Sequence, residues 1–245
     1  MFEAAVISEH GLRTEMEDAH FLDLNFGGNG WVYGGIYDGH GGSYAALYAA
    51  KHLPELFLQK YKVSQFPLSA LTACYEQISE NLKNIESGTT AVDFFIKDGR
   101  IYVANVGDAR AIVVSGHNVR PLTIDHRIGN PDEEQRIIRM GGVISPPYIL
   151  RGSSGLMPTR TIGDAYFKPV GVIATPSVRE YEIREDDIYL IGGCDGLFDF
   201  MSNEEVAQVA RKHRQPEILL EKLKQEILIN RGGSDNITLI AVKLH

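Results

Sequence analysis

The sequence predicts an α+β fold, in which runs of antiparallel strands alternate with pairs of helices. Two observations lead to this prediction. Three short apolar segments near the middle of the chain are separated by tight turns, and two pairs of amphipathic segments separate the strand-like runs. The 245 residues fit a single domain over 1–245, which is large enough to bury a core without disulfide bonds.

The first half of the chain is predicted to hold two strands, a helix pair and a meander of three strands. The strands are expected at residues 2–8, 31–37, 89–97, 101–106 and 110–115, and the helices at 43–61 and 67–86. Asp98-Gly99 and Gly116-His117-Asn118 have the composition of hairpin turns, so the last three strands should be antiparallel neighbours.

The second half begins with a short helix at 131–140, whose first turn is acidic and which Gly141-Gly142 ends. Residues 145–161 contain several Pro and Gly residues and no clear period, so we expect a long irregular loop that acts as a lid or flap. Strands are then expected at 178–183 and 187–192. A capping box at Ser202 and Glu205 begins one helix, Pro216 begins another, and residues 236–244 form a final strand.

Composition and charge exclude several classes of protein. With 44% hydrophobic and 23% charged residues the chain is neither disordered nor a coiled coil, and its net charge of −8 with no cluster of Lys and Arg predicts no nucleic-acid or membrane partner. The N-terminus lacks the features of a secretory signal, and the two cysteines give no disulfide framework. We therefore expect a cytoplasmic protein. Neither cysteine begins a Cys-(five residues)-Arg loop, which disfavours a cysteine nucleophile for phosphate chemistry.

Three segments share a pattern in which an apolar run enters glycines and then an aspartate. They are Gly34-Gly35-Ile36-Tyr37-Asp38-Gly39, Gly192-Gly193-Cys194-Asp195-Gly196 and Gly232-Gly233-Ser234-Asp235-Asn236. Carboxylates at neighbouring strand ends can converge, and glycines let a ligand approach closely. Converging carboxylates repel one another unless cations join them, and oxygen ligands suit Mg²⁺ or Mn²⁺ better than zinc. Ordinary turn chemistry is the alternative, and both interpretations stay open at this point.

A second group of chemically active residues lies near the N-terminus. The guanidinium of Arg13 has paired donors that suit phosphate oxygens, and Glu17 and Asp18 add two carboxylates beside it. A charged surface turn is the simpler alternative. His40, two residues after Asp38, could donate a proton near a metal, although a histidine in a glycine-rich loop is more often part of a polar surface.

Six motifs, taken together, carry a resemblance to a known family. They are Arg13-Thr14-Glu15-Met16-Glu17-Asp18-Ala19-His20, Asp38-Gly39-His40-Gly41-Gly42, Ser87-Gly88-Thr89-Thr90-Ala91, Val106-Gly107-Asp108-Ala109-Arg110, Asp195-Gly196-Leu197-Phe198-Asp199 and Asp235-Asn236. In order and approximate spacing they resemble the metal-dependent serine/threonine protein phosphatases, the PPM or type 2C family. The resemblance extends from about residue 6 to residue 242.

The resemblance implies a four-layer fold of two packed antiparallel sheets flanked by helix pairs, with a dinuclear Mg²⁺ or Mn²⁺ centre at one edge. It implies that Asp38 bridges the two metals and that Asp195 and Asp235 complete one site. The Gly39 carbonyl would help to hold the other metal, and Glu17 would act through bound water.

The same resemblance implies a mechanism. Arg13 would bind the phosphate, Asp18 would support the metal ligands, and His40 would protonate the departing serine or threonine oxygen. A hydroxide that bridges the two metals would attack phosphorus directly, because two cations lower the pKa of a bound water and neutralise the phosphoryl charge. Phosphorylated proteins would be the substrates, and the protein would be a monomer.

A third, weaker metal is also implied, with Asp108 and Asp195 at its site and Asp199 close by. Two segments depart from the family pattern and border the expected flap. The family usually has Ser-Arg-Ala-Leu-Gly-Asp where this chain has Thr159-Arg160-Thr161-Ile162-Gly163-Asp164. A lysine and a proline commonly follow the histidine where this chain has Asp125-His126-Arg127-Ile128. These departures affect the expected substrate preference.

Two other functions compete with a phosphoprotein phosphatase. One is a non-catalytic relative that binds phosphoproteins through the same surface, and it would be indicated by missing metal carboxylates, none of which is missing. The other is a metal-dependent phosphoesterase that acts on small molecules or nucleic acid, which the lack of a basic groove disfavours.

Overall fold

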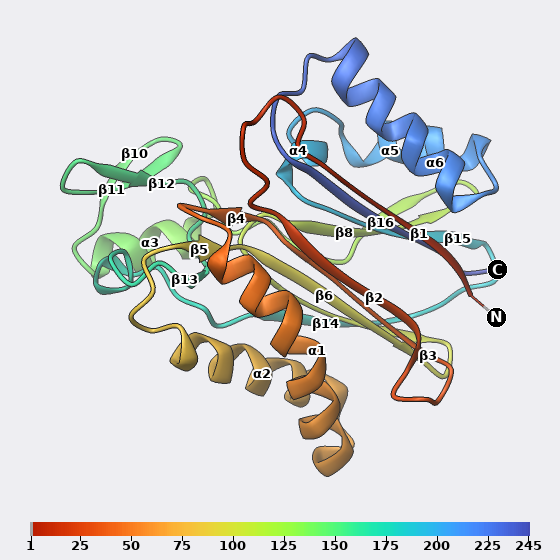
Figure 1. The fold of residues 1–245 in the computed structure, drawn as a ribbon, viewed down its shortest axis with the longest axis horizontal. Coiled ribbons are helices and arrows are strands. Elements are labelled where there is room, and N and C mark those ends of the chain that lie inside the picture. Colours follow the sequence, from red (N-terminus) through yellow and green to blue (C-terminus); the bar gives the residue numbers. More distant parts are fainter. Residues whose placement is uncertain (1) are drawn as a thin grey trace.

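Two five-stranded antiparallel sheets face each other in the computed structural model, which describes residues 2–245 (Figure 1). The first sheet has, in spatial order, β1 (Glu3–Glu9), β16 (Ile237–Lys243), β15 (Asp187–Gly193), β8 (Arg110–Ser115) and β9 (Val119–Pro121). The second has β14 (Ser177–Glu182), β7 (Arg100–Val106), β6 (Ala91–Lys97), β3 (Trp31–Tyr37) and β2 (Ala19–Phe26). The predicted α+β class, with two packed antiparallel sheets, is confirmed.

A helix pair covers the outer face of each sheet, as Figure 1 shows. The second sheet carries α1 (Tyr44–Ser64) and α2 (Pro67–Asn81), and the first carries α5 (Asn203–Lys212) and α6 (Pro216–Gln225), followed by one π-helical turn, η2 (Glu226–Asn230). The predicted capping box at Ser202 and Glu205 is present at the start of α5. In α1, Ala45, Ala49 and Leu53 recur at helical spacing and are fully buried, so the helix packs through one apolar face.

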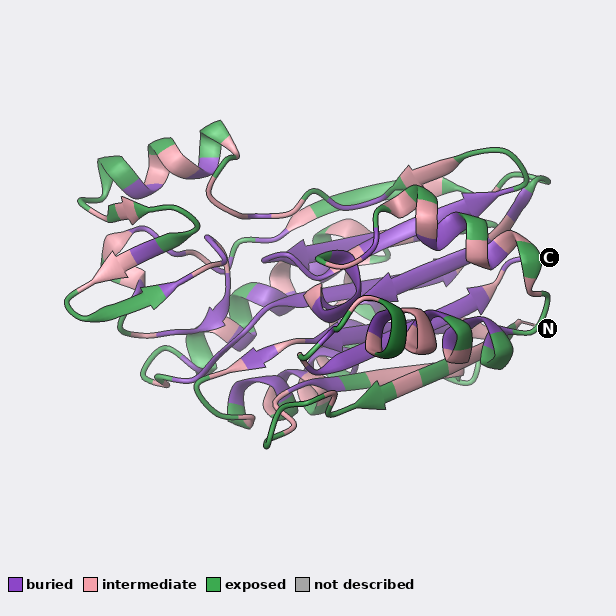
Figure 2. Cartoon of the chain, turned by 90° about the horizontal axis from the view of Figure 1, so that it is seen from above, coloured by how far each residue is buried: buried purple, intermediate pink, exposed green. Residues whose placement is uncertain are grey.

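The core between the sheets is apolar. It includes Ile36 and Phe94 from the second sheet and Val113, Leu190 and Ile240 from the first. Buried residues are concentrated in these strands, whereas the outer helices carry exposed ones (Figure 2). This packing fixes the position of the strand ends, from which the site residues extend.

Short strands beside the two sheets form a small third sheet of β13 (Ile162–Gly163), β5 (Gly88–Thr89) and β4 (Gly39–His40). The predicted strand at 89–97 is therefore divided. Thr90 donates its N–H to the carbonyl of Asp38 at 2.9 Å instead of continuing one ladder, so β5 and β6 belong to different sheets.

The prediction of an irregular loop at 145–161 is wrong for most of that segment. β10 (Val143–Ser145), β11 (Tyr148–Arg151) and β12 (Ser154–Leu156) form an antiparallel meander that packs with α3 (Pro131–Arg139) into a lobe at one end of the molecule (Figure 1). Three of its Pro and Gly residues lie in the turns: Pro146-Pro147 connects β10 to β11, and Gly152, with φ of 59°, lies between β11 and β12. Strands of three or four residues are too short to show an alternating pattern.

One buried glutamate joins this lobe to the rest of the molecule. Both carboxylate oxygens of Glu133, in α3, accept hydrogen bonds from Arg160, and one of them also accepts from Arg136 and from the hydroxyl of Thr159. These partners place the pKa of Glu133 well below its usual value even though burial raises it. The segment after β12 is thereby held against α3.

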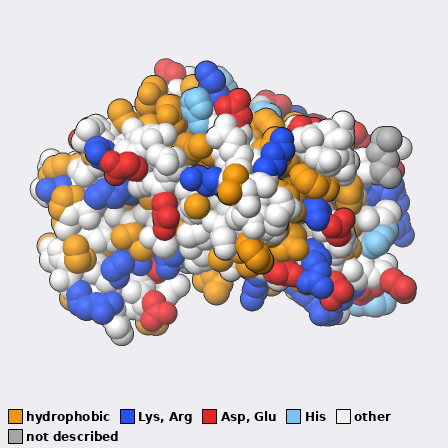
Figure 3. Space-filling view, turned by 90° about the horizontal axis from the view of Figure 1, so that it is seen from below, with side chains coloured by type: hydrophobic (Ala, Val, Ile, Leu, Met, Phe, Trp, Pro, Cys, Tyr) orange, Lys and Arg blue, Asp and Glu red, His pale blue; other side chains and the backbone are white. Residues whose placement is uncertain are grey.

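Other boundaries differ modestly from the predictions. The strand β2 was not predicted, and the helix expected to reach residue 86 ends at Asn81. A one-turn helix, α4 (Asp195–Phe198), and a 3₁₀ turn, η1 (Lys168–Val170), complete the described elements. Acidic, basic and hydrophobic side chains are interspersed on the face seen in Figure 3. None of the helices in the described part of the chain is long and apolar enough to cross a membrane.

Candidate metal centre

Four strand ends of the two sheets carry aspartates at one edge of the molecule. Asp38 follows β3 and Asp18 precedes β2, and the two strands are antiparallel neighbours that pair next to these residues. Asp195 follows β15 and Asp235 precedes β16, which are neighbours in the other sheet. Antiparallel pairing thus brings each pair of aspartates together, and the packing of the sheets brings the two pairs together.

A cavity of about 550 Å³ opens at this edge. Its lining includes most of the residues that the sequence singled out, namely Arg13, Glu17, Asp38, Gly39, His40, Asp108, Asp195 and Asp235. The segment from Gly155 to Pro158, at the end of the flap, lines it as well. Asp18 and Asp199 are not in the lining.

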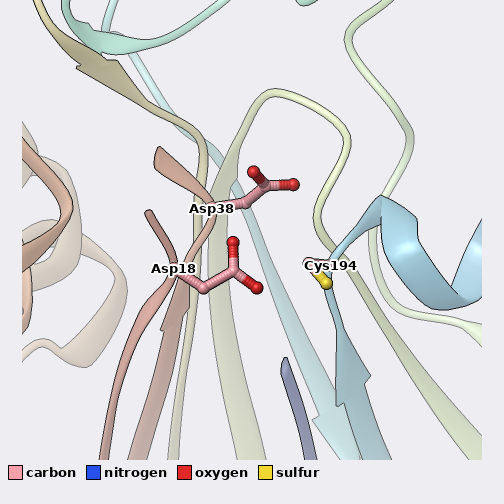
Figure 4. A group of neighbouring side chains, drawn as sticks. All are labelled: Asp18, Asp38 and Cys194. Carbon is pink, nitrogen blue, oxygen red and sulfur yellow. The ribbon is translucent and has the colours of Figure 1, made fainter. Parts of the chain in front are cut away.

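Asp18 lies next to Asp38 and Cys194, and ligand atoms of the three side chains lie within 4.8 Å of one another (Figure 4). Cys194 forms two hydrogen bonds with the backbone: its thiol donates to the carbonyl of Asn236 at 3.4 Å, and its sulfur accepts from the N–H of Thr238 at 3.2 Å. Burial raises the pKa of this thiol well above its usual value. A protonated thiol is a poor metal ligand, so the carboxylates are the ligands on offer.

Two glycines allow the close approaches that the site needs. A Cβ at Gly39 would lie 2.3 Å from the carbonyl oxygen of Glu17, and a Cβ at Gly196 would lie 2.0 Å from that of Asn236. Neither distance is possible for a side chain. These glycines bring the Glu17 loop against Asp38, and the start of α4 against Asp235 and Asn236.

The clustered aspartates raise the pKa values of one another's carboxyl groups. Burial is the largest cause for Asp38, whose pKa lies well above its usual value, and the charges of Asp195, Asp18 and Asp108 add to it. Burial and the charges of Asp108 and Asp199 raise the pKa of Asp195 to about 7. Burial raises the pKa of Asp18 to about 6. Such groups are costly to ionise together unless a cation is near.

The donor set fits a hard divalent cation. Oδ2 of Asp18 is buried and has no hydrogen-bond partner within residues 2–245. The other candidate ligands are carboxylate and backbone carbonyl oxygens, which are the ligands that Mg²⁺ and Mn²⁺ prefer.

The loop that carries Glu17 is held by four hydrogen bonds. Asn236 accepts from the N–H of Glu17 at 2.9 Å and donates to the carbonyls of His10 and Glu15 at 3.0 Å each. The carboxylate of Glu17 accepts from the N–H of Gly42 at 2.5 Å. The Asp-Asn pair that precedes β16 therefore has two tasks: the aspartate lines the cavity and the asparagine shapes the neighbouring loop.

Arg13 extends over the cavity with its side chain 57% exposed, and one of its nitrogen atoms donates to Asp235 at 2.7 Å. The hydrogen bond and the charge of Asp235 raise the pKa of Arg13 further. Its remaining donors are available to an anion in the cavity.

His40 has a partner that the sequence analysis did not select. Nε2 of His40 lies 2.8 Å from a carboxylate oxygen of Asp164, which is buried and has φ of 51°. Burial lowers the pKa of His40, but the hydrogen bond and the charge of Asp164 outweigh it and raise the pKa. The signal for Asp164 was present in the sequence, because Ile162-Gly163-Asp164 repeats the pattern of an apolar residue, a glycine and an aspartate.

Arg127 is the second functional residue that the sequence analysis did not select. Its guanidinium contacts Asp108, Asp195 and Asp199. The three expected residues of the weaker metal site are thus brought together, but around an arginine.

Comparison with known proteins agrees with this geometry. The family model described as Protein phosphatase 2C matches residues 2–237, and the chain belongs to this family. The family is metal-dependent, and the acidic residues of the cavity could bind metal.

Two similar proteins come from Arabidopsis thaliana. Probable protein phosphatase 2C 71 is 35% identical over 99% of this chain and 55% of its own length, and probable protein phosphatase 2C 69 is 34% identical over 99% of this chain and 70% of its own length. The chain therefore spans about half to two-thirds of the length of these relatives. A similar rice protein, probable protein phosphatase 2C member 13, is labelled mitochondrial.

Solved structures share the fold. A serine-threonine phosphatase 2C from Toxoplasma gondii has a TM-score of 0.84 at 23% identity, with 99% of this chain and 94% of that chain covered. A sex determining protein of C. elegans has a TM-score of 0.85 at 23% identity, with 100% of this chain and 65% of that chain covered.

The raised pKa of Asp195 predicts that its carboxylate lowers the free energy of unfolding of the metal-free protein by an amount that depends on pH. Between pH 3.8, the ordinary pKa of an aspartate, and about pH 7, Asp195 binds a proton in the folded state that it has lost in the unfolded state. The contribution of Asp195 to stability therefore falls as pH rises through this range. In a chelator at pH 8, Asp195→Asn should therefore increase the free energy of unfolding by on the order of 1–3 kcal/mol, and the gain should shrink towards pH 5.

Urea unfolding at both pH values measures this difference, with Asp98→Asn as the control because that carboxylate is 75% exposed in a turn. A variant that is no more stable than the wild type at pH 8 would show that the carboxylates do not repel one another as described.

Proposed function

We propose that this protein is a metal-dependent phosphoprotein phosphatase that hydrolyses phosphoserine and phosphothreonine. The observation that carries the proposal is that Asp38, Asp195 and Asp235 line one cavity together with Arg13. Membership of the protein phosphatase 2C family supports it.

We assign the cations to the carboxylate side of the cavity. Asp38, Asp195 and Asp235, the carbonyl of Gly39 and the carboxylate of Glu17 would hold two Mg²⁺ or Mn²⁺ ions, and Asp18 would support Asp38 from behind. When bound, such ions neutralise charge on phosphoryl oxygens and acidify a water molecule. The high pKa values of Asp38 and Asp195 support this assignment, because a cation is what would keep both groups ionised at neutral pH.

Arg13 is assigned to the phosphate. Its planar guanidinium can donate two parallel hydrogen bonds to phosphoryl oxygens, and its ion pair with Asp235 orients it over the cavity. This ion pair would fix the position of the positive charge at the cavity, so Asp235 would both contribute a ligand oxygen and position Arg13.

His40 is assigned to the leaving group. Asp164 holds Nε2, which leaves Nδ1 as the nitrogen that gives its proton to the departing serine or threonine oxygen. The raised pKa of His40 keeps the ring protonated at a higher pH than an isolated histidine, as a general acid needs.

The same proposal covers the remaining expectations from the sequence. Residues 145–161 act as the flap of a single catalytic domain, which is supported by the position of Gly155–Pro158 at the cavity wall. The enzyme acts as a cytoplasmic monomer on phosphorylated proteins, without nucleic-acid or membrane partners. The mixture of charges on the face seen in Figure 3 is compatible with this choice.

The proposal predicts that hydrolysis requires the metal and Asp38. After chelation, release of phosphate from a phosphoserine peptide should stop, and Mn²⁺ or Mg²⁺ should restore it. Asp38→Asn should lower kcat about 1000-fold at saturating Mn²⁺, because it removes a ligand charge worth several kcal/mol of transition-state stabilisation. Asp98→Asn is the matched control.

A nucleotide monophosphate and a phosphodiester, assayed in parallel, separate the competing functions. Faster hydrolysis of either one than of the phosphopeptide would favour a small-molecule or nucleic-acid phosphoesterase. Tight binding of the phosphopeptide without turnover would indicate a non-catalytic relative, and activity that survives chelation would contradict the proposal.

The role of His40 predicts a difference between two leaving groups. His40→Ala should lower kcat for a phosphoserine peptide by about 100-fold or more, because the serine alkoxide needs a proton to leave. The loss should be small for p-nitrophenyl phosphate, whose phenolate leaves without help. His117→Ala, in an exposed turn, is the control. Equal losses for the two substrates would refute the general-acid role.

A further inference from the structure

The guanidinium of Arg127 fills the space between three carboxylates. Nε lies 2.5 Å from Oδ2 of Asp108, Nη1 and Nη2 lie 2.7 and 3.1 Å from the two oxygens of Asp199, and Nη2 also lies 3.3 Å from Oδ2 of Asp195. The contact with Asp199 is bidentate, which is the strongest arrangement available to an arginine and a carboxylate.

These contacts leave no room for a cation among the same oxygen atoms. Divalent cations such as Mg²⁺ bind carboxylate oxygens at about 2.0–2.1 Å and need several ligands in a defined geometry. The guanidinium nitrogens already contact one oxygen of Asp108 and both oxygens of Asp199 at hydrogen-bond distance. The expectation of a third cation at this place therefore does not fit the side chains present.

The position of Arg127 is set by the backbone on both sides. Its backbone forms an antiparallel bridge with Pro158, at the end of the flap, and the preceding residue His126 accepts from the N–H of Thr159 at 2.8 Å. His126 also donates its own N–H to the carbonyl of Gly107 at 2.9 Å, directly before Asp108. The segment His126-Arg127 therefore holds the base of the flap and also places the arginine against the carboxylates.

The side chain of Arg127 is buried enough for its charge to act on the neighbouring carboxylates with little screening. Arg127 is 25% exposed and Asp108 only 2%, while Asp199 is 40% exposed at the outer end of the group. A permanent charge near a buried carboxylate is screened little by salt. Arg127 does not line the cavity, so it acts on the site through Asp108 and Asp195 and not by touching a substrate.

We propose that Arg127 is a built-in cation that takes the place of a third metal ion, so that this enzyme binds two divalent cations and not three. The inference rests on the proposed function, because it assumes that Asp38, Asp195 and Asp235 hold two ions. Arg127 is then a positioning residue: it holds Asp195 and Asp108 and ties them to the flap. Lysine would supply a point charge but could not bridge the same oxygens in one plane.

The number of Mn²⁺ ions that the protein binds tests this inference without an activity assay. Calorimetric titration of the chelated wild-type protein, checked by the electron paramagnetic resonance signal of free Mn²⁺, should give two ions per chain. Asp199→Asn should leave this number unchanged, because Asp199 binds Arg127 and no metal. This variant alters one half-exposed carboxylate and does not depend on the folding of a more severe change.

Arg127→Met removes the arginine itself instead of one of its carboxylate partners. It removes the charge at similar length and should raise the number of bound Mn²⁺ ions from two to three, and adding Asp199→Asn to it should return the number to two. Arg211→Met is the matched control, because Arg211 is similarly buried and pairs with Glu204 away from the cavity. It should keep two ions.

The outcomes separate the inference from the proposed function. Three ions in the wild type, with the weakest lost in Asp199→Asn, would overturn the role of Arg127 and leave the metal centre in place. Two ions in folded Arg127→Met would also overturn it. No bound Mn²⁺ in any variant would overturn the proposed function and this inference with it.

Discussion

Repulsion among buried carboxylates is the constraint that the rest of this structure must accommodate. Asp18, Asp38, Asp108 and Asp195 lie close enough for their charges to act on one another, and burial already disfavours the ionised form of each. Side-chain pairing compensates part of this charge through Arg127, and Arg13 compensates Asp235 at the rim. The remaining negative charge is what a bound cation would balance.

The two-sheet architecture makes this arrangement possible. The apolar core between the sheets and the two helix pairs stabilise the strands, and only the strand ends at one edge carry the acidic residues. Stability and function are therefore separated in space: a continuous apolar core supports a small region that would not be stable by itself. The close backbone contacts at Gly39 and Gly196 also fix the positions of the loops next to the strand ends.

Much of the fold could be predicted because it depends on local patterns. The hairpin turns at Asp98-Gly99 and Gly116-His117-Asn118 and the capping box at Ser202 are properties of short segments. β2 was missed because its apolar and charged residues mix along a half-exposed edge strand, and the flap meander was missed because its strands are very short. In both cases partner strands, and not local propensity, determine the structure.

The site divides in the same way. The glycine-aspartate pattern located Asp38, Asp195 and Asp235, whereas the partners of Arg127 lie 19 to 72 positions away in the sequence and could not be inferred from its neighbours. The pairing of His40 with Asp164 spans 124 positions. Such pairings arise only when the sheets pack, so sequence reasoning identified the cavity carboxylates and Arg13 but not Arg127 or Asp164.

The most direct test of this account is a crystal structure of the protein with Mn²⁺, with anomalous diffraction recorded at the manganese edge. The account predicts two anomalous peaks at the cavity wall formed by Asp38, Asp195 and Asp235, and the guanidinium of Arg127 in contact with Asp108 and Asp199. The absence of any peak at that wall would contradict the central claim that the converging carboxylates form a metal centre. A peak between Asp108 and Asp199, with Arg127 displaced, would contradict the claim that Arg127 takes the place of a third cation.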